Sequence, residues 1–294
     1  MSWATHGSGG LCSGRELSEF ITRGEELNWA DLRLFIFDLD GVVYLGREPV
    51  PGAKETLDHL TKLGGDIFYV TNNSTRTRMQ FQEKLAHMGI AATEGQIVTS
   101  AYATACYLNE LHEGATVYII GEEGLITEFK DAGFHVLFKD DAIDAVDFVI
   151  VGLDRKFTYQ KLSNALSAVE QGAQFVATND DPTLPTESGL LPGAGTLVAA
   201  LSNAIGRPPL ITIGKPNPFM LNLILKTRKI KPSNAVIIGD RYTTDIKAGV
   251  HAQIKTILVK TGVGFQELKE IPVSGPHPDL ILDSVADFHK FLSV

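Results

Sequence analysis

The stretch Phe35-Ile36-Phe37-Asp38-Leu39-Asp40-Gly41 is an apolar run that ends in two carboxylates and a glycine. A continuous run of this kind is typical of a strand buried on both faces of a parallel sheet. Positions i and i+2 of a strand point to the same side, and open α/β sheets bind ligands at the carboxyl ends of their strands. Two neighbouring carboxylates repel each other unless a cation lies between them or one is protonated. The pair therefore predicts a hard cation, with one carboxylate attacking and the other transferring a proton.

The rest of the chain repeats this alternation. From Leu32 onward, short apolar runs end in Gly, Asp, Asn or Thr and are followed by helical periods, which indicates βαβ units and a mostly parallel sheet. Helices are predicted over residues 75–88 and 158–171. Strands are predicted at residues 34–37, 67–70, 97–99, 117–120, 148–151, 175–177, 210–213, 236–238, 256–259 and 280–282.

These strands are too many for one ordinary sheet, and the polar groups suited to chemistry fall into an early and a late group. An inserted domain accounts for both facts. We predict an α/β fold with a Rossmann-like, doubly wound parallel-sheet core, formed by residues 31–99 and 208–294, and an inserted smaller α/β domain. That domain spans residues 100–207 and ends where Gly-Arg-Pro-Pro breaks a helix. Residues 1–30 form an N-terminal appendage.

Composition excludes several classes of protein. The 294-residue chain carries a net charge of −9 with no cluster of Lys and Arg, so nucleic acid is not an expected partner. Cys12 and Cys106 form no disulfide framework and show no zinc-binding spacing. No apolar run approaches the roughly 18 residues of a membrane span, and no export signal is present. We therefore expect a cytoplasmic protein without a membrane partner.

A second predicted strand ends in Thr71-Asn72-Asn73-Ser74. A hydroxyl and successive backbone N–H groups before a helix form a suitable anion cradle. Alternatively, Ser74 or Thr75 only caps that helix. Lys215, between a glycine and a proline at a third strand end, is placed to pair with a carboxylate and with phosphate oxygens, although a lone Lys in a turn is usually just solvated.

A fourth strand ends at Asp240, which suits a metal ligand, and Asp245 either holds a metal-bound water or caps the next helix. The carboxyl ends of parallel strands meet at one edge, so these strand ends together predict phosphoryl transfer. No GxxxxGK[ST], no GxGxxG after a strand, no GxSxG and no HExxH is present, which disfavours the corresponding alternatives.

In order and spacing, DLDG at 38–41, TNNS at 71–74, GKP at 214–216 and GDRYTTD at 239–245 resemble the four motifs of the haloacid dehalogenase superfamily of phosphohydrolases. The resemblance covers residues 32–290. It implies an Mg²⁺-dependent phosphatase in which Asp38 is the nucleophile and a metal ligand, and Asp40 is the general acid/base that also binds metal through its carbonyl. It further implies the following roles: phosphate binding by Thr71 and by the backbone of Asn72 and Asn73, orientation of Asp38 by Lys215, and metal binding by Asp240 with Asp245 behind it.

The position of the insertion resembles the branch with a large α/β cap, which contains p-nitrophenyl, phosphoglycolate, pyridoxal-phosphate, nucleotide and sugar phosphatases. Residues 177–196 are similar to the substrate-specificity loop of that branch and imply specificity roles for Asn179, Asp181 and Leu184. The branch's pyridoxal-phosphate phosphatases tend to carry histidine at the position of Leu184. The absence of that histidine favours phosphoglycolate, or a broad range of small phosphorylated metabolites, as the substrate. A homodimer is common in the branch. A phosphotransferase or mutase and a non-catalytic sensor of phosphorylated ligands are the rival functions.

Overall fold

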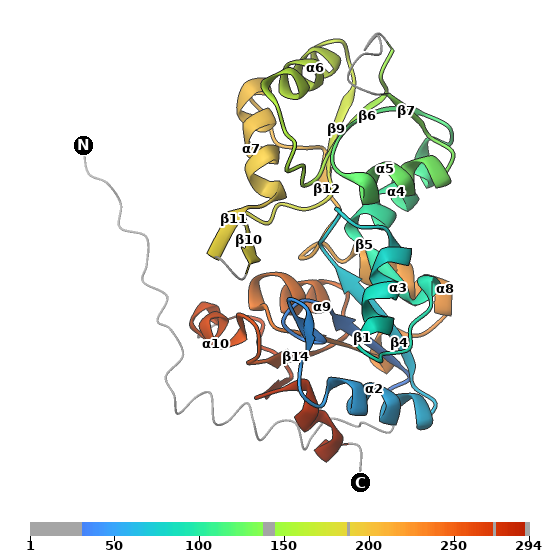
Figure 1. The fold of residues 1–294 in the computed structure, drawn as a ribbon, viewed down its shortest axis with the longest axis vertical. Helices are drawn as coiled ribbons and strands as arrows, with labels where there is room; N and C mark the ends of the chain where they lie inside the picture. Colours follow the sequence, from blue (N-terminus) through green and yellow to red (C-terminus); the bar gives the residue numbers. More distant parts are fainter. Residues whose placement is uncertain (1–30, 138–144, 187–188, 273–274, 292–294) are drawn as a thin grey trace, which may run out of the picture. The chain divides into compact units, whose positions relative to one another are not determined.

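The computed structural model describes residues 31–137, 145–186, 189–272 and 275–291. The appendage predicted for residues 1–30, with Cys12, lies outside the described residues. The chain divides into two compact units (Figure 1). The first, here called the carboxylate unit, is formed by residues up to Ile67 together with Arg228–Val294. The second, here called the inserted unit, is Phe68–Thr227.

The first sheet is six-stranded, with the order β15-β14-β13-β1-β4-β5. Its pairs with a described register are all parallel, for example β1 with β13 and β13 with β14. Every residue of β1 and of β13 is buried, as the apolar composition of these strands predicts. The strands are β1 (Leu34–Asp38), β4 (Asp66–Thr71), β5 (Ile97–Thr99), β13 (Ala235–Gly239), β14 (Lys255–Val259) and β15 (Leu280–Leu282).

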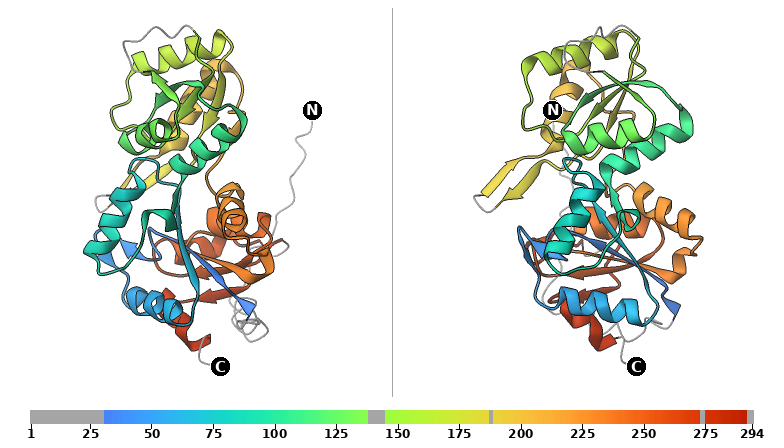
Figure 2. Two further views of the ribbon diagram at one scale, coloured as in Figure 1. Left: turned by 90° about the vertical axis from the view of Figure 1, so that its right-hand side faces the viewer. Right: turned by 45° about the vertical axis from the view of Figure 1, so that its right-hand side comes forward.

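The second sheet is five-stranded and parallel, with the order β12-β9-β8-β6-β7, and lies within the inserted unit. Alternate residues of its strands face opposite sides, because side chains alternate along a strand. One side packs against α6 (Tyr159–Glu170) and α7 (Ala194–Ile205) and the other against α4 (Ser100–Leu111) and α5 (Glu123–Asp131), which gives three layers (Figure 2). The strands are β6 (Thr116–Ile120), β7 (His135–Leu137), β8 (Phe148–Val151), β9 (Gln174–Ala177) and β12 (Ile211–Thr212).

The helices follow the strands in the βα alternation that the sequence predicts. The carboxylate unit contains α2 (Ala53–Lys62), α9 (Lys247–His251), α10 (Gly264–Glu267) and the short hairpin of β2 (Tyr44–Leu45) and β3 (Glu48–Pro49). The other helices are α3 (Arg78–His87), α4 (Ser100–Leu111), α5 (Glu123–Asp131), α6 (Tyr159–Glu170), α7 (Ala194–Ile205) and α8 (Phe219–Arg228). The predicted fold class, a parallel α/β core with an inserted α/β domain, is confirmed. The boundaries 31–99, 100–207 and 208–294 stay predictions.

One local prediction is wrong. The helix expected from residue 75 begins at Arg78, because Thr77 caps it: the Thr77 hydroxyl accepts from Gln80 N, and the Gln80 side chain accepts from Thr77 N. The segment around Leu184, for which no strand was predicted, contains an antiparallel hairpin of β10 (Thr183–Thr186) and β11 (Gly189–Pro192), which extends away from the second sheet in Figure 2. In the described residues, no helix is long and apolar enough to cross a membrane.

Candidate active site

Three buried carboxylates meet at the carboxyl ends of β1 and β13. Asp38 is the last residue of β1, Asp240 directly follows β13, and Asp245 lies in a π-helical turn at Tyr242–Ile246. One oxygen from each lies within 4.8 Å of the others, and the side chains are only 8%, 6% and 1% exposed. Buried like charges at this spacing repel each other strongly, and a hard divalent cation with oxygen ligands compensates them. The donor set therefore fits a cation such as Mg²⁺.

A glycine-lined slot fixes the Asp240 carboxylate. Its Oδ2 accepts a hydrogen bond of 2.8 Å from Val263 N. Gly41 and Gly262 have φ of 90° and 60°, and a Cβ at either position would collide with this carboxylate. Thr261 Oγ1 donates to Gly41 O at 2.5 Å and so ties the two glycine turns together.

The Thr-Gly-Val segment at residues 261–263 was missed by the sequence analysis. The available signal was a turn with two glycines, Thr-Gly-Val-Gly at 261–264, directly after a buried strand at the ligand-binding edge.

Asp245 is oriented by the turn that precedes it. Its Oδ2 accepts from Arg241 N at 3.1 Å, and its side chain lies so close to Gly239 that a Cβ there would collide with it. The alternative in which Asp245 caps the next helix is wrong, because α9 begins at Lys247 without a side-chain cap. Asp245 thus contributes its carboxylate to the acidic group at the strand ends.

Asp40 lies outside this acidic group. β1 ends at Asp38, so the strand alternation assumed for the pair does not extend to Asp40, which forms an isolated bridge with Tyr44. The Asp40 side chain is exposed, and its Oδ2 accepts from the Tyr44 hydroxyl at 3.2 Å. An exposed carboxylate held by a buried phenol is accessible for proton transfer.

In the inserted unit, the residues after β4 form a chain of local hydrogen bonds. Thr71 Oγ1 accepts from Asn73 N at 3.1 Å, and Asn73 Oδ1 accepts from Thr75 N at 2.9 Å and from Thr75 Oγ1 at 2.8 Å.

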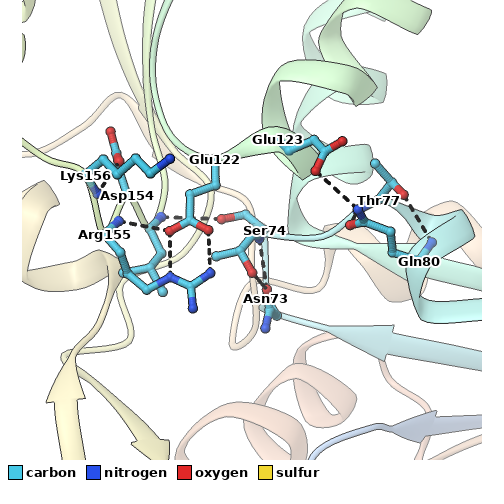
Figure 3. A network of polar contacts seen from close by, with 11 residues as sticks. Asn73, Ser74, Thr77, Gln80, Glu122, Glu123, Asp154, Arg155 and Lys156 are labelled. Atoms are coloured by element: carbon cyan, nitrogen blue, oxygen red, sulfur yellow. Dashed lines mark hydrogen bonds and ion pairs between the residues drawn. The ribbon is translucent and has the colours of Figure 1, made fainter. Parts of the chain in front are cut away.

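The Ser74 hydroxyl accepts from Leu153 N at 3.4 Å (Figure 3). The alternative in which Ser74 or Thr75 only caps α3 is therefore wrong, because Thr77 occupies that position.

Asn72 holds the backbone of Lys215. Asn72 Oδ1 accepts from Lys215 N at 2.8 Å, and Asn72 Nδ2 donates to Lys215 O at 2.9 Å and to Asp181 Oδ2 at 3.1 Å. Asn179 Nδ2 donates to Asn72 O at 2.9 Å. Lys215 is 2% exposed and precedes a cis proline bond. The structure thus brings Asn72, Asn179, Asp181 and Lys215 together. Leu184 instead pairs with Leu191 in the hairpin.

An ion pair lies beside this segment. Arg155 donates two hydrogen bonds to the carboxylate of Glu122, from Nε to Oε1 at 2.8 Å and from Nη2 to Oε2 at 2.6 Å (Figure 3). These hydrogen bonds, opposed by partial burial and helped by the Arg155 charge, hold the pKa of Glu122 below its ordinary value. The Arg155 side chain is 62% exposed and the Glu122 side chain 19%, so water reaches the pair mainly from the guanidinium side.

Comparison with known proteins identifies the family to which this chain belongs. Residues 35–135 match the haloacid dehalogenase-like hydrolases, and residues 212–288 match a second description, HAD-hydrolase-like. An acid sugar phosphatase of Staphylococcus epidermidis is 42% identical over 87% of this chain and 98% of its own length. The chain belongs to the haloacid dehalogenase-like hydrolases.

Solved structures of this hydrolase family agree with that assignment. A p-nitrophenyl phosphatase from Archaeoglobus fulgidus superposes with a TM-score of 0.81 at 32% identity, covering 88% of this chain and 99% of that one. A 4-nitrophenylphosphatase from Thermotoga maritima gives a TM-score of 0.82 at 29% identity, covering 89% and 98%. The predicted family and the predicted enzyme class, a phosphoric monoester hydrolase, are confirmed.

Proposed function

We propose that this haloacid dehalogenase-like hydrolase is an Mg²⁺-dependent phosphatase that cleaves small organic phosphate monoesters through an aspartyl-phosphate on Asp38. The observation that carries the proposal is the buried group of Asp38, Asp240 and Asp245, whose oxygens approach within 4.8 Å at the carboxyl ends of β1 and β13. Carboxylates in this arrangement suit a hard cation better than any other ligand.

The proposed cycle has two displacements at phosphorus. An Asp38 carboxylate oxygen attacks the phosphorus, and the bond to the leaving alkoxide breaks as Asp40 donates its proton to that oxygen. Asp40 then accepts a proton from water, the water oxygen bonds to phosphorus, and the Asp38–phosphorus bond breaks. Inorganic phosphate leaves, and both carboxylates return to their starting state. The hydrogen bond from Tyr44 and the exposure of Asp40 support its role in proton transfer.

Mg²⁺ would be held by Asp38 and Asp240, with the Asp40 carbonyl as a further ligand and Asp245 behind them. When bound, it offsets the negative charge shared by the carboxylates and the phosphate. The slot around Asp240 supports this assignment, because the hydrogen bond from Val263 N fixes one carboxylate oxygen in a set direction.

We assign phosphate binding to the Thr71 hydroxyl, to the backbone N–H groups of Asn72 and Asn73, and to the Lys215 ammonium. A lysine offsets repulsion between a carboxylate nucleophile and its anionic substrate. Support comes from the burial of Lys215 and from the two hydrogen bonds by which Asn72 fixes its backbone.

The names of the relatives favour sugar phosphates and p-nitrophenyl phosphate as substrates, so we propose a broad small-molecule phosphatase. Phosphoglycolate stays a prediction, as do the specificity roles of Asn179, Asp181 and Leu184. We further propose that residues 100–207 act as the cap that selects the substrate. The homodimer and the cytoplasmic location are predictions as well.

A steady-state assay tests the proposal. The purified chain is incubated with p-nitrophenyl phosphate, a panel of hexose and pentose phosphates, phosphoglycolate, pyridoxal phosphate and nucleoside monophosphates. Each is measured with Mg²⁺, with EDTA, and with EDTA followed by excess Mg²⁺. We expect phosphate release that EDTA abolishes and Mg²⁺ restores. Phosphate release that persists in EDTA refutes the metal assignment, and no release from any substrate refutes the phosphatase.

A further inference from the structure

The segment of residues 72–76 packs against the carboxyl end of the second sheet, where glycines allow it to approach. Gly152 follows β8, and a Cβ at this position would lie 2.7 Å from Ser74 Oγ. Gly214 follows β12, and a Cβ there would lie 2.7 Å from Asn72 Oδ1. A Cβ at either position would force a neighbouring atom to shift, and at Gly214 one of those neighbours is the backbone oxygen of Thr178, also at 2.7 Å. The segment therefore occupies the edge of this sheet at which parallel α/β sheets usually bind ligands.

Gly124, near the start of α5, adds a third close approach. Its N–H donates to Thr75 O at 3.1 Å, and a Cβ there would collide with the backbone of Arg76. One turn further along α5, the Glu128 carboxylate accepts from Arg78 Nε at 3.0 Å and 3.2 Å. The segment that follows β4 is thus held on several sides by other parts of the inserted unit.

Asn72 is the most highly connected residue of this segment. Its amide nitrogen donates to Lys215 O and to Asp181 Oδ2, and its amide oxygen accepts from Lys215 N. Its carbonyl oxygen accepts from Ser100 Oγ at 2.6 Å and from Asn179 Nδ2 at 2.9 Å. Both amide protons of the side chain are therefore used, one toward Lys215 and one toward Asp181.

Asp181 is anchored in turn by its backbone. Its N–H donates to Asn179 Oδ1 at 3.3 Å, and its carbonyl accepts from Gly195 N at 2.9 Å in the first turn of α7. The carboxylate that accepts from Asn72 is thereby fixed relative to a regular helix. A hydrogen bond to a carboxylate is roughly twice as strong as one between neutral groups.

We infer that Asp181 is a positioning residue for Lys215, acting through the side chain of Asn72. The Asp181 carboxylate sets the plane and the orientation of the Asn72 amide, and that amide holds the N–H and the carbonyl of Lys215. Loss of the carboxylate removes one of the three hydrogen bonds that orient the amide, and so loosens its hold on the Lys215 backbone. This inference rests on the proposed function, since Lys215 is assigned there to the phosphate.

The resemblance to the capped branch implies a role in substrate specificity for Asp181, and a positioning role differs from it in kinetic signature. A specificity residue changes KM by an amount that depends on the substrate. A residue that positions Lys215 changes kcat by the same factor for every phosphate ester, because the phosphate is common to all of them. Comparing substrates with different leaving groups therefore separates the two roles.

The experiment compares Asp181→Ala with Asp181→Asn on p-nitrophenyl phosphate and on the best sugar phosphate. We expect Asp181→Ala to lower kcat about 10- to 100-fold on both, the size expected of a displaced catalytic group. Asp181→Asn should restore most of kcat, because its amide oxygen still accepts from Asn72. Asp180→Asn is the matched control, since Asp180 is the adjacent exposed carboxylate, and it should leave kcat unchanged.

A double-mutant cycle tests the route through Asn72. In an Asn72→Ala background, Asp181→Ala should lower kcat no further, whereas independent residues give multiplicative losses. The inference is overturned by multiplicative losses, by an Asp181→Asn variant as impaired as Asp181→Ala, or by an effect on KM confined to one substrate. Thermal melting identifies a variant that does not fold, and Asp181→Ser then replaces Asp181→Ala.

The wild-type chain separates failure of this inference from failure of the proposed function. If the wild type releases no phosphate from any substrate, the proposed function fails. If the wild type is active and Asp181→Ala matches Asp180→Asn, only the role of Asp181 is refuted.

Discussion

The acidic group of the carboxylate unit and the hydrogen-bond network of the inserted unit differ in how their buried polar groups are compensated. Asp38, Asp240 and Asp245 place buried carboxylates within 4.8 Å of one another, an arrangement that a bound cation would stabilise. Asn72 instead finds partners for its amide protons, its amide oxygen and its carbonyl inside the chain. In the proposed function the first region binds an added ion, and the second is organised by hydrogen bonds within the chain.

Substitutions in the two regions should therefore have different effects. Changes to the acidic group should alter metal binding and, through it, both activity and stability. Changes around Asn72 should alter turnover without altering the response to metal. The following predictions test this separation.

Asp38→Asn should abolish turnover. An amide is a poor nucleophile, so the aspartyl-phosphate cannot form, and we expect kcat to fall by more than about a thousandfold at saturating Mg²⁺. The measurement is phosphate release, with thermal melting to verify the fold. Near-normal activity of the Asp38→Asn variant would contradict the assignment of Asp38 as the nucleophile.

Lys215→Met should lower kcat by about 100- to 1000-fold, because the ammonium that stabilises developing negative charge is lost. Its matched control is Lys226→Met, since Lys226 is 73% exposed and pairs with Glu110 on the surface. The melting temperature of Lys215→Met should still rise with Mg²⁺. A variant that has lost this response would show that the two regions are not separable.

Mg²⁺ should stabilise the wild-type chain and not Asp240→Asn. A ligand at about 100 times its Kd adds about 2.7 kcal/mol to the free energy of unfolding. The check is thermal melting with increasing Mg²⁺, and Asp180→Asn serves as an exposed carboxylate control. Equal shifts for wild type and Asp240→Asn would place the ion elsewhere.

Gly262→Ala should cost about 1–3 kcal/mol of folding stability, because φ is 60° at this position. It should also weaken Mg²⁺ binding, since the new Cβ would collide with the Asp240 carboxylate. Gly64→Ala provides the comparison: φ is 81° there, and no atom lies within 4 Å of the added Cβ. Both variants should lose stability, and only Gly262→Ala should need more Mg²⁺. An unchanged Mg²⁺ requirement in Gly262→Ala would contradict the proposed slot.

The smallest effect is expected for Glu122→Gln, measured by urea unfolding across pH. Arg155 lowers the folded-state pKa of Glu122 below its ordinary value of 4.5. The pair therefore stabilises the fold above that value, and this stability is lost as pH falls through the folded-state pKa. Because Arg155 is 62% exposed, we expect Glu122→Gln to cost less than about 1 kcal/mol at neutral pH. A cost that grows on acidification would contradict this sign.

The acidic group was accessible from sequence because it follows from local rules. Asp38 and Asp240 directly end buried strands, and parallel strands place their carboxyl ends at one edge. The hydrogen bonds of Asn72 were not accessible in this way. They join residues 143 and 109 positions apart, and a short amide has no preferred partner that composition reveals. The slot formed by Gly41 and Gly262 also joins distant positions, and its only local signal was the two-glycine turn at residues 261–264.

Element boundaries were also only partly accessible. The helix start at Arg78 depends on reciprocal hydrogen bonds between Thr77 and Gln80. From residue types alone, Ser74 and Thr75 were equally suitable as the N-cap of this helix. The β10–β11 hairpin is hidden by prolines at positions 185 and 192, which strand patterns normally exclude.

The glycines at positions 124, 152 and 214 have a consequence for protein engineering. Their missing side chains leave sockets: the Ser74 and Asn72 side chains lie in those at Gly152 and Gly214, and the Arg76 backbone lies in the one at Gly124. An inserted domain transplanted from another hydrolase would need matching sockets before it could pack against this segment. The β10–β11 hairpin carries no such constraint along its exposed β11 strand, whose residues are all solvent-facing. Libraries aimed at new substrates should therefore randomise the hairpin and leave the sockets untouched.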